Sequence, residues 1–355
     1  MNAPFTHRKI SRRHMLQITA ALAGTATLGL TSRISLAQGK GKIVVGTWGG
    51  DYARLLTKNI EQPLLISQGW EVVQDQAGDP ERRSKMLAER RLPRGSSDVQ
   101  GLSALNIYQM YDAGATAEID YSKLANAKYL LPSMKYKGGV GHIYSGKVAV
   151  YNPKVVQTTP KSYKDVFDPT HGNKLGIIDI QYQYTIVAAA LAAGGSVSNL
   201  EPGKKLLLEV RKAGARIYPT NEAFAQGLKA EEFGIGIMWK ARTVQWQNAG
   251  IPVKAAAPSE GTLAYVSGFA VPKNAPNPEG AYAYLDAMLA ESAQEAFAVD
   301  MGYNPTVTDA KVAPDLNQRI GFTPEQVKHL VNLDYGYMNE QDPELKDWWD
   351  KEFKG

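Results

Sequence analysis

Residues 42–50 read KIVVGTWGG, an apolar, β-branched run that ends in two glycines. Such a run is typical of a buried strand followed by a tight loop. Residues 52–64 repeat apolar side chains at helical spacing, so we expect the folded chain to open with a strand, a loop and a helix. The alternation continues with strands expected at 70–73 and 98–102 and helices at 82–89 and 105–113. This order predicts a parallel sheet covered by helices.

The pattern starts again after residue 147. We expect strands at 148–151, 175–180, 215–218 and 234–239, and helices at 163–167, 185–193 and 203–213. Two such α/β units in a chain of 355 residues predict two lobes with a cleft between them. Ligands of open α/β sheets bind beyond the carboxyl ends of the strands, so the residues that follow these strands are the first candidates for ligand contact.

The composition, with 44% hydrophobic and 21% charged residues, is that of a folded globular protein. The formal net charge of +5 would suit a nucleic-acid-binding protein if the charge lay in the folded part. It lies instead in residues 1–37, which hold five of the 40 basic residues and no acidic residue. The rest of the chain is neutral overall, so we expect no nucleic-acid partner.

Residues 11–16 read SRRHML, a twin-arginine export pattern. An apolar stretch rich in Gly, Ala and Thr follows at 18–30, and residues 35–37 (SLA) form a cleavage site of the small-x-small type. We therefore expect residues 1–37 to be a signal peptide, removed to leave a periplasmic protein. The alternative is a retained membrane anchor, for which the stretch is short and interrupted by Thr and Gly.

The chain has no cysteine, which excludes disulfides, thiolate zinc sites, iron–sulfur clusters and a cysteine nucleophile. His142, His171 and His329 are the histidines beyond the leader, and they lack the spacing of a zinc-binding motif. Tyr182 and Tyr184 suggest a tyrosinate ferric site, but no acid and histidine set accompanies them. We expect no metal and no cofactor.

Residues 141–147 satisfy the phosphate-loop pattern GxxxxGK, except that Val148 stands where Ser or Thr would bind magnesium. A β-like run follows, so no helix N-terminus is available to receive a phosphate. The nucleophile-elbow motif GxSxG is absent, whereas a carboxylate pair of the glycosidase kind is left open because acids are plentiful. Near the C-terminus, we expect Trp348 and Trp349 to dock an amphipathic segment onto a lobe rather than to contact ligand.

Four segments, taken in chain order, carry a resemblance to a known family: VGTWGG at 45–50, GIGIMW at 234–239, GFAVPKNA at 268–275 and MGYNP at 301–305. They resemble the polyamine-type (spermidine/putrescine) periplasmic binding proteins of ABC transporters. The resemblance implies an α/β protein with the type II periplasmic-binding fold, in which two lobes joined by a hinge enclose the ligand cleft. It places lobe I at 38–147 and 268–310, and lobe II at 148–267 and 311–355.

In that family, aromatic side chains and carboxylates hold bound amines. Carried over by position, the aromatic contacts are Trp48, Trp239, Tyr265 and Tyr303, and the carboxylate is Asp179. An aromatic face attracts an alkylammonium group by about 0.5–2 kcal/mol, and a carboxylate compensates its desolvated charge. Each aromatic residue could instead be part of the hydrophobic core. Asp179 lies inside an apolar run, and its carboxylate could instead cap backbone N–H groups.

The chain departs from the family in its acids. Tyr182 and Ser267 stand where polyamine binders carry carboxylates, and Lys240 and Arg242 follow Trp239. The predicted ligand-binding residues are therefore Trp48, Asp179, Trp239, Lys240, Tyr265, Ser267 and Tyr303. A cleft with one acid favours a solute with a single ammonium end near Asp179 and a neutral or carboxylate end toward Ser267 and Lys240.

The sequence thus predicts a monomeric, non-enzymatic capture component of an ABC importer. We expect it to bind a small organic amine or zwitterionic amino compound by hinge closure and to deliver it to a membrane permease. The alternative is a secreted hydrolase that uses an acid pair in the cleft.

Overall fold

The computed structural model describes residues 39–355, so the expected signal peptide lies outside the described residues. The strands are β1 (Gly41–Thr47), β2 (Trp70–Gln76), β3 (Val99–Ser103), β4 (Lys135–Tyr136), β5 (Gly139–Tyr151), β6 (Gly176–Ile178), β7 (Arg216–Tyr218), β8 (Ile235–Trp239), β9 (Lys254–Ala256), β10 (Thr262–Ala270), β11 (Asn304–Pro305) and β12 (Leu330–Val331).

The α-helices are α1 (Gly50–Leu56), α2 (Asp79–Glu89), α3 (Ala104–Asp112), α4 (Tyr163–Val166), α5 (Tyr182–Ala192), α6 (Glu201–Lys212), α7 (Asn221–Lys229), α8 (Lys240–Asn248), α9 (Pro278–Met288), α10 (Glu291–Met301), α11 (Pro314–Ile320), α12 (Pro324–Lys328) and α13 (Tyr335–Trp348). Short segments used below are the 3₁₀ turn η7 (Asp179–Gln181) and the π-helical turn η8 (Trp349–Phe353). Over residues 39–355, no helix is long and apolar enough to cross a membrane.

The main sheet begins as the sequence predicts. β1 pairs in parallel with β2 and β3, and its Ile43 and Val45 are fully buried. β10 and β5 then join antiparallel, with Phe269 of β10 opposite Gly101 of β3. The parallel pairing expected for the first three strands is confirmed, whereas the antiparallel strands β5 and β10 were not part of that expectation. β5 and β10 run between the two halves of the fold.

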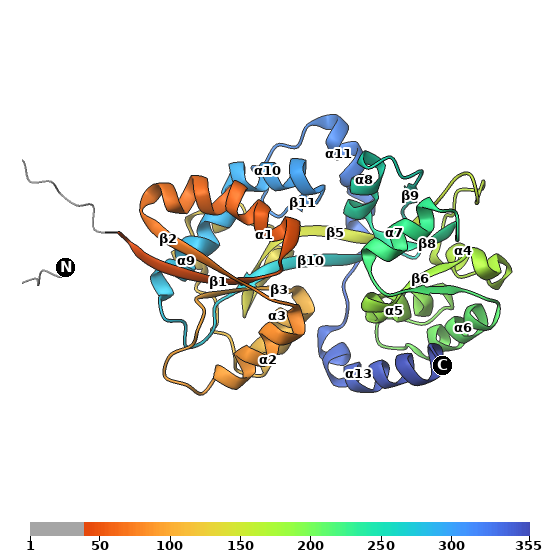
Figure 1. Ribbon diagram of the computed structural model, residues 1–355, viewed down its shortest axis with the longest axis horizontal. Helices are drawn as coiled ribbons and strands as arrows, with labels where there is room; N and C mark the ends of the chain where they lie inside the picture. Colours follow the sequence, from red (N-terminus) through yellow and green to blue (C-terminus); the bar gives the residue numbers. More distant parts are fainter. Residues whose placement is uncertain (1–38) are drawn as a thin grey trace, which may run out of the picture. The chain divides into compact units, whose positions relative to one another are not determined.

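Figure 1 shows β5 and β10 side by side across the middle of the described chain. The first part of β5 pairs with β4 and β11, whereas residues 147–151 pair with β8 and β9. The strand expected at 148–151 is therefore the end of a longer strand. Because residues 141–147 also lie inside β5, the phosphate-loop pattern forms no loop.

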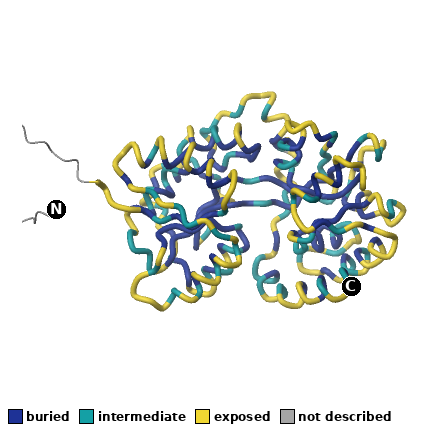
Figure 2. Tube along the Cα trace, viewed as in Figure 1, coloured by how far each residue is buried: buried dark blue, intermediate teal, exposed yellow. Residues whose placement is uncertain are grey.

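Two separate hydrophobic cores define two α/β lobes (Figure 2). One core gathers side chains of β1, β3, α9 and α10, among them Val99 and Tyr284. The other gathers side chains of β6, β8, α5 and α7, among them Phe224 and Met238. The boundaries expected at residues 147 and 267 fall within β5 and β10, and as exact limits they stay a prediction.

The strand expected at 175–180 is shorter than the sequence suggests. β6 ends at Ile178, and Asp179 opens η7, which leads into α5. Asp179 therefore lies just beyond the carboxyl end of the strand and not within an apolar run. Because the carboxylate lies beyond the end of the strand, it is not an unpaired charge inside the apolar core, which would be unfavourable.

The C-terminal segment docks as predicted. Trp349 is fully buried, and its ring centroid lies 4.2 Å from that of Phe353 in the core of the second lobe. At its other end, α13 reaches the first lobe, where the ring of Tyr335 lies 6.2 Å from that of Tyr108 on α3. The segment 311–355, assigned to lobe II from the sequence, thus touches both lobes.

Candidate functional site

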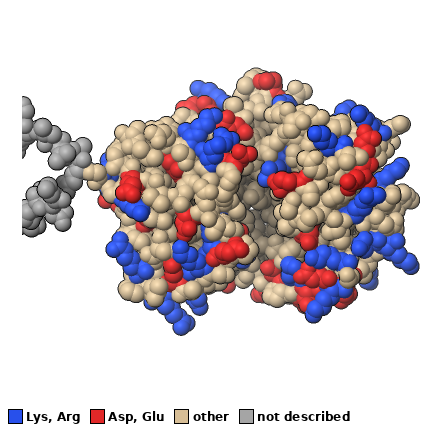
Figure 3. Space-filling view, in the orientation of Figure 1, with Lys and Arg blue, Asp and Glu red and all other residues tan. Residues whose placement is uncertain are grey.

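The face of the molecule in Figure 3 is hollowed between the lobe that carries α2 and α3 and the lobe that carries α13. The predicted ligand-binding residues lie on β10, which with β5 joins the lobes, or at the ends of strands in both lobes. Their individual contacts decide which of them have a surface free for a solute.

Trp48 directly follows β1 and is half-buried. The Arg82 guanidinium covers its ring, with the guanidinium carbon 4.6 Å from the ring centroid, and Tyr52 packs edge-on at 5.3 Å. Arg82 has a side chain that is 1% exposed and donates from Nε to the Ala77 carbonyl oxygen at 3.1 Å. Beside these contacts, Trp48 keeps part of its side chain exposed.

Trp239 ends β8 and is 6% exposed. Tyr265 stacks on its ring at 4.6 Å, Tyr184 meets it edge-on at 4.7 Å, and the Lys147 Nζ lies 4.3 Å from the ring centroid. Lys147 is opposite Trp239 in the β5–β8 register, which explains this contact. A ligand reaches the ring of Trp239 only if Lys147 or Tyr265 moves.

Tyr265 and Ser267 project from the same face of β10, because alternate strand residues share a face. Tyr265 is half-buried, whereas Ser267 is 2% exposed. Tyr303 is 4% exposed, with its ring 6.1 Å from that of Tyr265. Burial raises the pKa of Tyr265 and of Tyr303, so both hydroxyls are protonated donors at neutral pH.

Lys240, at the start of α8, points toward the loop that follows α11. Its Nζ donates to the Gly321 carbonyl oxygen and lies 4.8 Å from the ring centroid of Phe322. Burial lowers the pKa of Lys240 to about 8. In this arrangement its ammonium group holds a loop, and the solute contact expected from the sequence stays a prediction.

Asp179 contacts the C-terminal segment. Its Oδ1 accepts from the Trp349 indole Nε1 at 2.7 Å, and its Oδ2 lies 3.2 Å from the Lys354 Nζ. The sequence indicated that this carboxylate needs a partner, and the structure supplies two protein donors. Its predicted ammonium contact is not tested by this geometry, but an incoming ammonium group would have to share the carboxylate with Lys354.

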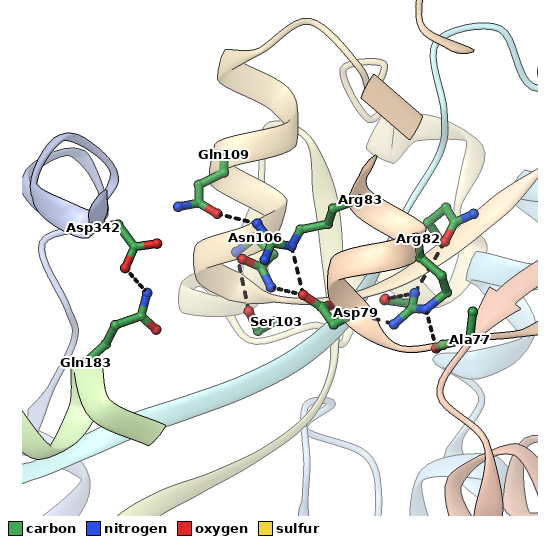
Figure 4. Close-up of polar contacts among 11 residues, drawn as sticks. Ala77, Asp79, Arg82, Arg83, Ser103, Asn106, Gln109, Gln183 and Asp342 are labelled. Atoms are coloured by element: carbon green, nitrogen blue, oxygen red, sulfur yellow. Dashed lines mark hydrogen bonds and ion pairs between the residues drawn. The ribbon is translucent and has the colours of Figure 1, made fainter. Parts of the chain in front are cut away.

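Sequence reasoning did not include a polar group that borders the hollow (Figure 4). On α2 and α3, Asp79 accepts from the Arg83 Nε at 2.8 Å and from the Asn106 Nδ2 at 2.7 Å. Figure 4 shows Gln183 and Asp342 of the other lobe facing this group. The sequence could have indicated these residues, because α2 and α3 follow the carboxyl ends of β2 and β3, where ligands of α/β sheets bind.

The two tyrosines of the ferric alternative point to different partners. The Tyr182 hydroxyl donates to Asp342 Oδ1 at 2.6 Å, whereas Tyr184 packs on Trp239. Within residues 39–355, no three histidine, cysteine, aspartate or glutamate side chains gather in a group able to hold a metal ion.

Two α/β lobes, each with its own core, are joined by the continuous strands β5 and β10, and the surface is hollowed between them (Figure 3). This is the architecture of a hinged, two-lobed protein. A family model described as bacterial extracellular solute-binding protein matches residues 62–324. The chain belongs to this family, and its role as a solute-binding protein follows from that membership. Members of the family bind solutes and are not enzymes.

A relative in sequence is the spermidine/putrescine-binding periplasmic protein of Salmonella typhimurium, 25% identical over 245 residues that cover 65% of this chain and 67% of the relative. In fold, a crystal structure of an ABC transporter protein from Clostridium perfringens matches with a TM-score of 0.75 at 23% identity, covering 87% of this chain and 99% of that one. A GABA receptor structure matches with a TM-score of 0.76 at 21% identity, covering 87% and 96%.

Proposed function

We propose that this chain is the exported, non-enzymatic capture component of an ABC importer, which closes its lobes around a small organic amine or zwitterionic amino compound and delivers it to a membrane permease. The carrying observation is the passage of β5 and β10 through both lobes. Small dihedral changes along two paired strands move one lobe against the other without breaking either core.

The proposed ligand surface combines two half-buried aromatic rings with two buried hydroxyls. Trp48 and Tyr265 are the half-buried rings, and Ser267 and Tyr303 supply the hydroxyls. An aromatic face next to hydroxyl donors suits an alkylamine whose other end is polar. Relatives named for spermidine and putrescine, and a fold neighbour named for GABA, support an amino compound as the solute.

The hydrolase alternative needs two carboxylates free to exchange protons with a substrate. Asp79, Asp179 and Asp342 border or approach the cleft, and each accepts hydrogen bonds from protein donors. No observation favours a catalytic pair, and we therefore propose binding without turnover.

The test starts from protein purified under native conditions. The solute released by denaturation is identified by mass spectrometry and added back to protein refolded without it. We expect a smaller radius of gyration in solution scattering, because the lobes close. We also expect stabilisation of about 2.7 kcal/mol at a hundredfold excess over Kd. Chemical conversion of the solute by the protein would show an enzyme instead.

Trp48→Ala is the site variant for the same titration. We expect it to weaken binding at least about tenfold, equivalent to about 1.4 kcal/mol, with Trp48→Phe retaining most of the affinity because it keeps an aromatic face. Normal binding by a folded Trp48→Ala protein would place the solute elsewhere.

A further inference from the structure

Three basic side chains near the proposed cleft, Lys147, Lys240 and Arg242, form no ion pair with a carboxylate of residues 39–355. Lys147 is fully buried, its Nζ donates to the Gln181 amide oxygen, and burial lowers the pKa of Lys147 well below its usual range. Its charged form is therefore disfavoured. Lys240 donates to the Gly321 carbonyl oxygen, which leaves Arg242 as the uncompensated charge. Arg242 donates from Nη1 to the Gln245 amide oxygen at 3.1 Å, while its Nε is a buried donor that finds no partner in the described chain.

The acids of the same region are already engaged. Asp179 contacts Trp349 and Lys354, Asp342 accepts from the Tyr182 hydroxyl, and Asp79 accepts from Arg83. The uncompensated charge beside the cleft is therefore positive. A buried charge without a partner is costly, so an anionic group brought by a ligand would be stabilised there.

The surroundings of the aromatic rings also argue against a second ammonium group on the ligand. The Arg82 guanidinium lies over Trp48, and the Lys147 Nζ lies over Trp239. Each ring thus already has a nitrogen group of the protein on one side. A ligand ammonium group would have to share these rings with Arg82 and Lys147.

Arg242 lies next to the aromatic residues Trp239, Tyr265 and Tyr303, where it is placed to bind a carboxylate of the solute. It lies in the first turn of α8, directly after Trp239, and the Ala241 backbone amide of the same turn donates to the Ser145 hydroxyl of β5 at 3.1 Å. Burial raises the pKa of Tyr265 and of Tyr303, and the charge of Arg242 opposes this rise at both hydroxyls. Trp239, which stacks on Tyr265, directly precedes α8, and Gln245 of α8 donates from Nε2 to the Met301 carbonyl oxygen at 2.7 Å. The start of α8 therefore lies beside the segments that carry Tyr265 and Tyr303.

We infer that the solute carries a carboxylate, and that the Arg242 guanidinium binds it beside Tyr265 and Tyr303. The inference rests on the proposed function and narrows its ligand class, organic amines and zwitterionic amino compounds, to those that carry a carboxylate. A guanidinium with free N–H groups is the side chain best shaped to bind a carboxylate.

The experiment uses three four-carbon probes that differ in end groups: butane-1,4-diamine, 4-aminobutanoate and butanedioate. Thermal shift and calorimetric titration are carried out on the native protein and on Arg242→Met, Arg242→Lys and Arg319→Met. Arg319 is exposed and donates to the Asn248 side chain at 2.7 Å, so its variant controls for the loss of one arginine. We expect one or both carboxylate probes to raise the melting temperature and the diamine to leave it unchanged.

We expect Arg242→Met to lower the affinity for the carboxylate probe at least tenfold, Arg242→Lys to lower it less, and Arg319→Met to leave it unchanged. Arg242→Lys also keeps the test informative if Arg242→Met does not fold. A shift with the diamine alone, a shift with none of the three probes, or equal binding by the native protein and Arg242→Met overturns the inference. The solute-binding role is judged separately, by the closure that the co-purified solute produces.

Discussion

His142 is an imidazole buried in β5 on the side of the first lobe. Its ring packs edge-on against Phe297 at 4.5 Å, and its Nδ1 lies 3.0 Å from the Tyr52 hydroxyl. Burial lowers the pKa of His142 from its ordinary value of 6.5 to about 3. The folded protein therefore keeps this ring neutral under conditions in which the unfolded chain would protonate it.

The sign of the resulting pH dependence follows from linkage. Between pH 6.5 and about 3 the unfolded state binds the extra proton, so the stability supplied by neutral His142 is complete above pH 6.5 and falls as the pH falls. The slope is about 1.4 kcal/mol per pH unit. We expect His142→Gln to lose this slope when the free energy of unfolding is measured by denaturant titration from pH 4 to 7.

His329→Gln is the control, because the side chain of His329 is 65% exposed. His329→Gln should retain the slope of the native protein. Carboxylates also titrate in this pH range, but their contribution is the same in the native protein and in both variants. An unchanged slope in His142→Gln would mean that acid does not act through this imidazole.

At the scale of elements, the C-terminal turn η8 closes the second lobe. Trp349 and Phe353 complete the core, and Asp179 receives the Trp349 indole N–H and the Lys354 ammonium group. The side chains of Asp179 and Lys354 are 28% and 31% exposed, so solvent weakens their attraction. The indole hydrogen bond and the apolar contacts hold most of this interface.

We expect Asp179→Asn and Lys354→Met each to lower the free energy of unfolding by an amount on the order of 1 kcal/mol or less, and to leave solute affinity unchanged. Lys354→Met should have the larger effect on stability, because Lys354 also pairs with Asp350 at 2.7 Å. Lys351→Met, which removes an exposed pair with Asp347, should change neither quantity. Calorimetric titration with the co-purified solute, together with denaturant unfolding, measures both. A tenfold loss of affinity confined to Asp179→Asn would instead assign it the ammonium contact expected from the sequence.

At the scale of the whole molecule, the lobes are separate in their cores and continuous in their strands. Export of such a protein in the folded state is what the twin-arginine leader at residues 11–16 predicts. The mass of the periplasmic protein should correspond to a chain that begins at Gln38, and the double variant Arg12→Lys, Arg13→Lys should leave precursor in the cytoplasm. Export of the double variant at the native rate would contradict this route.

Much of the architecture follows from local patterns. The strand at 42–48, the alternating helices and the restart after residue 147 all depend on side-chain periodicity, which a single sequence displays directly. The strand-end rule also brought Trp48 and Trp239 to attention as candidates. Periodicity does not show that one strand passes through both lobes, and the length of β5 was therefore missed.

The sequence by itself determined the two α/β units, the family and the chemical kinds of residue available near the cleft. The tertiary structure decided which of those residues have free surface and free charge. Trp239 and Lys147 are opposite each other only because β8 pairs with β5, and Asp179 meets Lys354 only because the chain end folds back onto β6. Such partners are far apart in sequence, and no local pattern carries the distance between them.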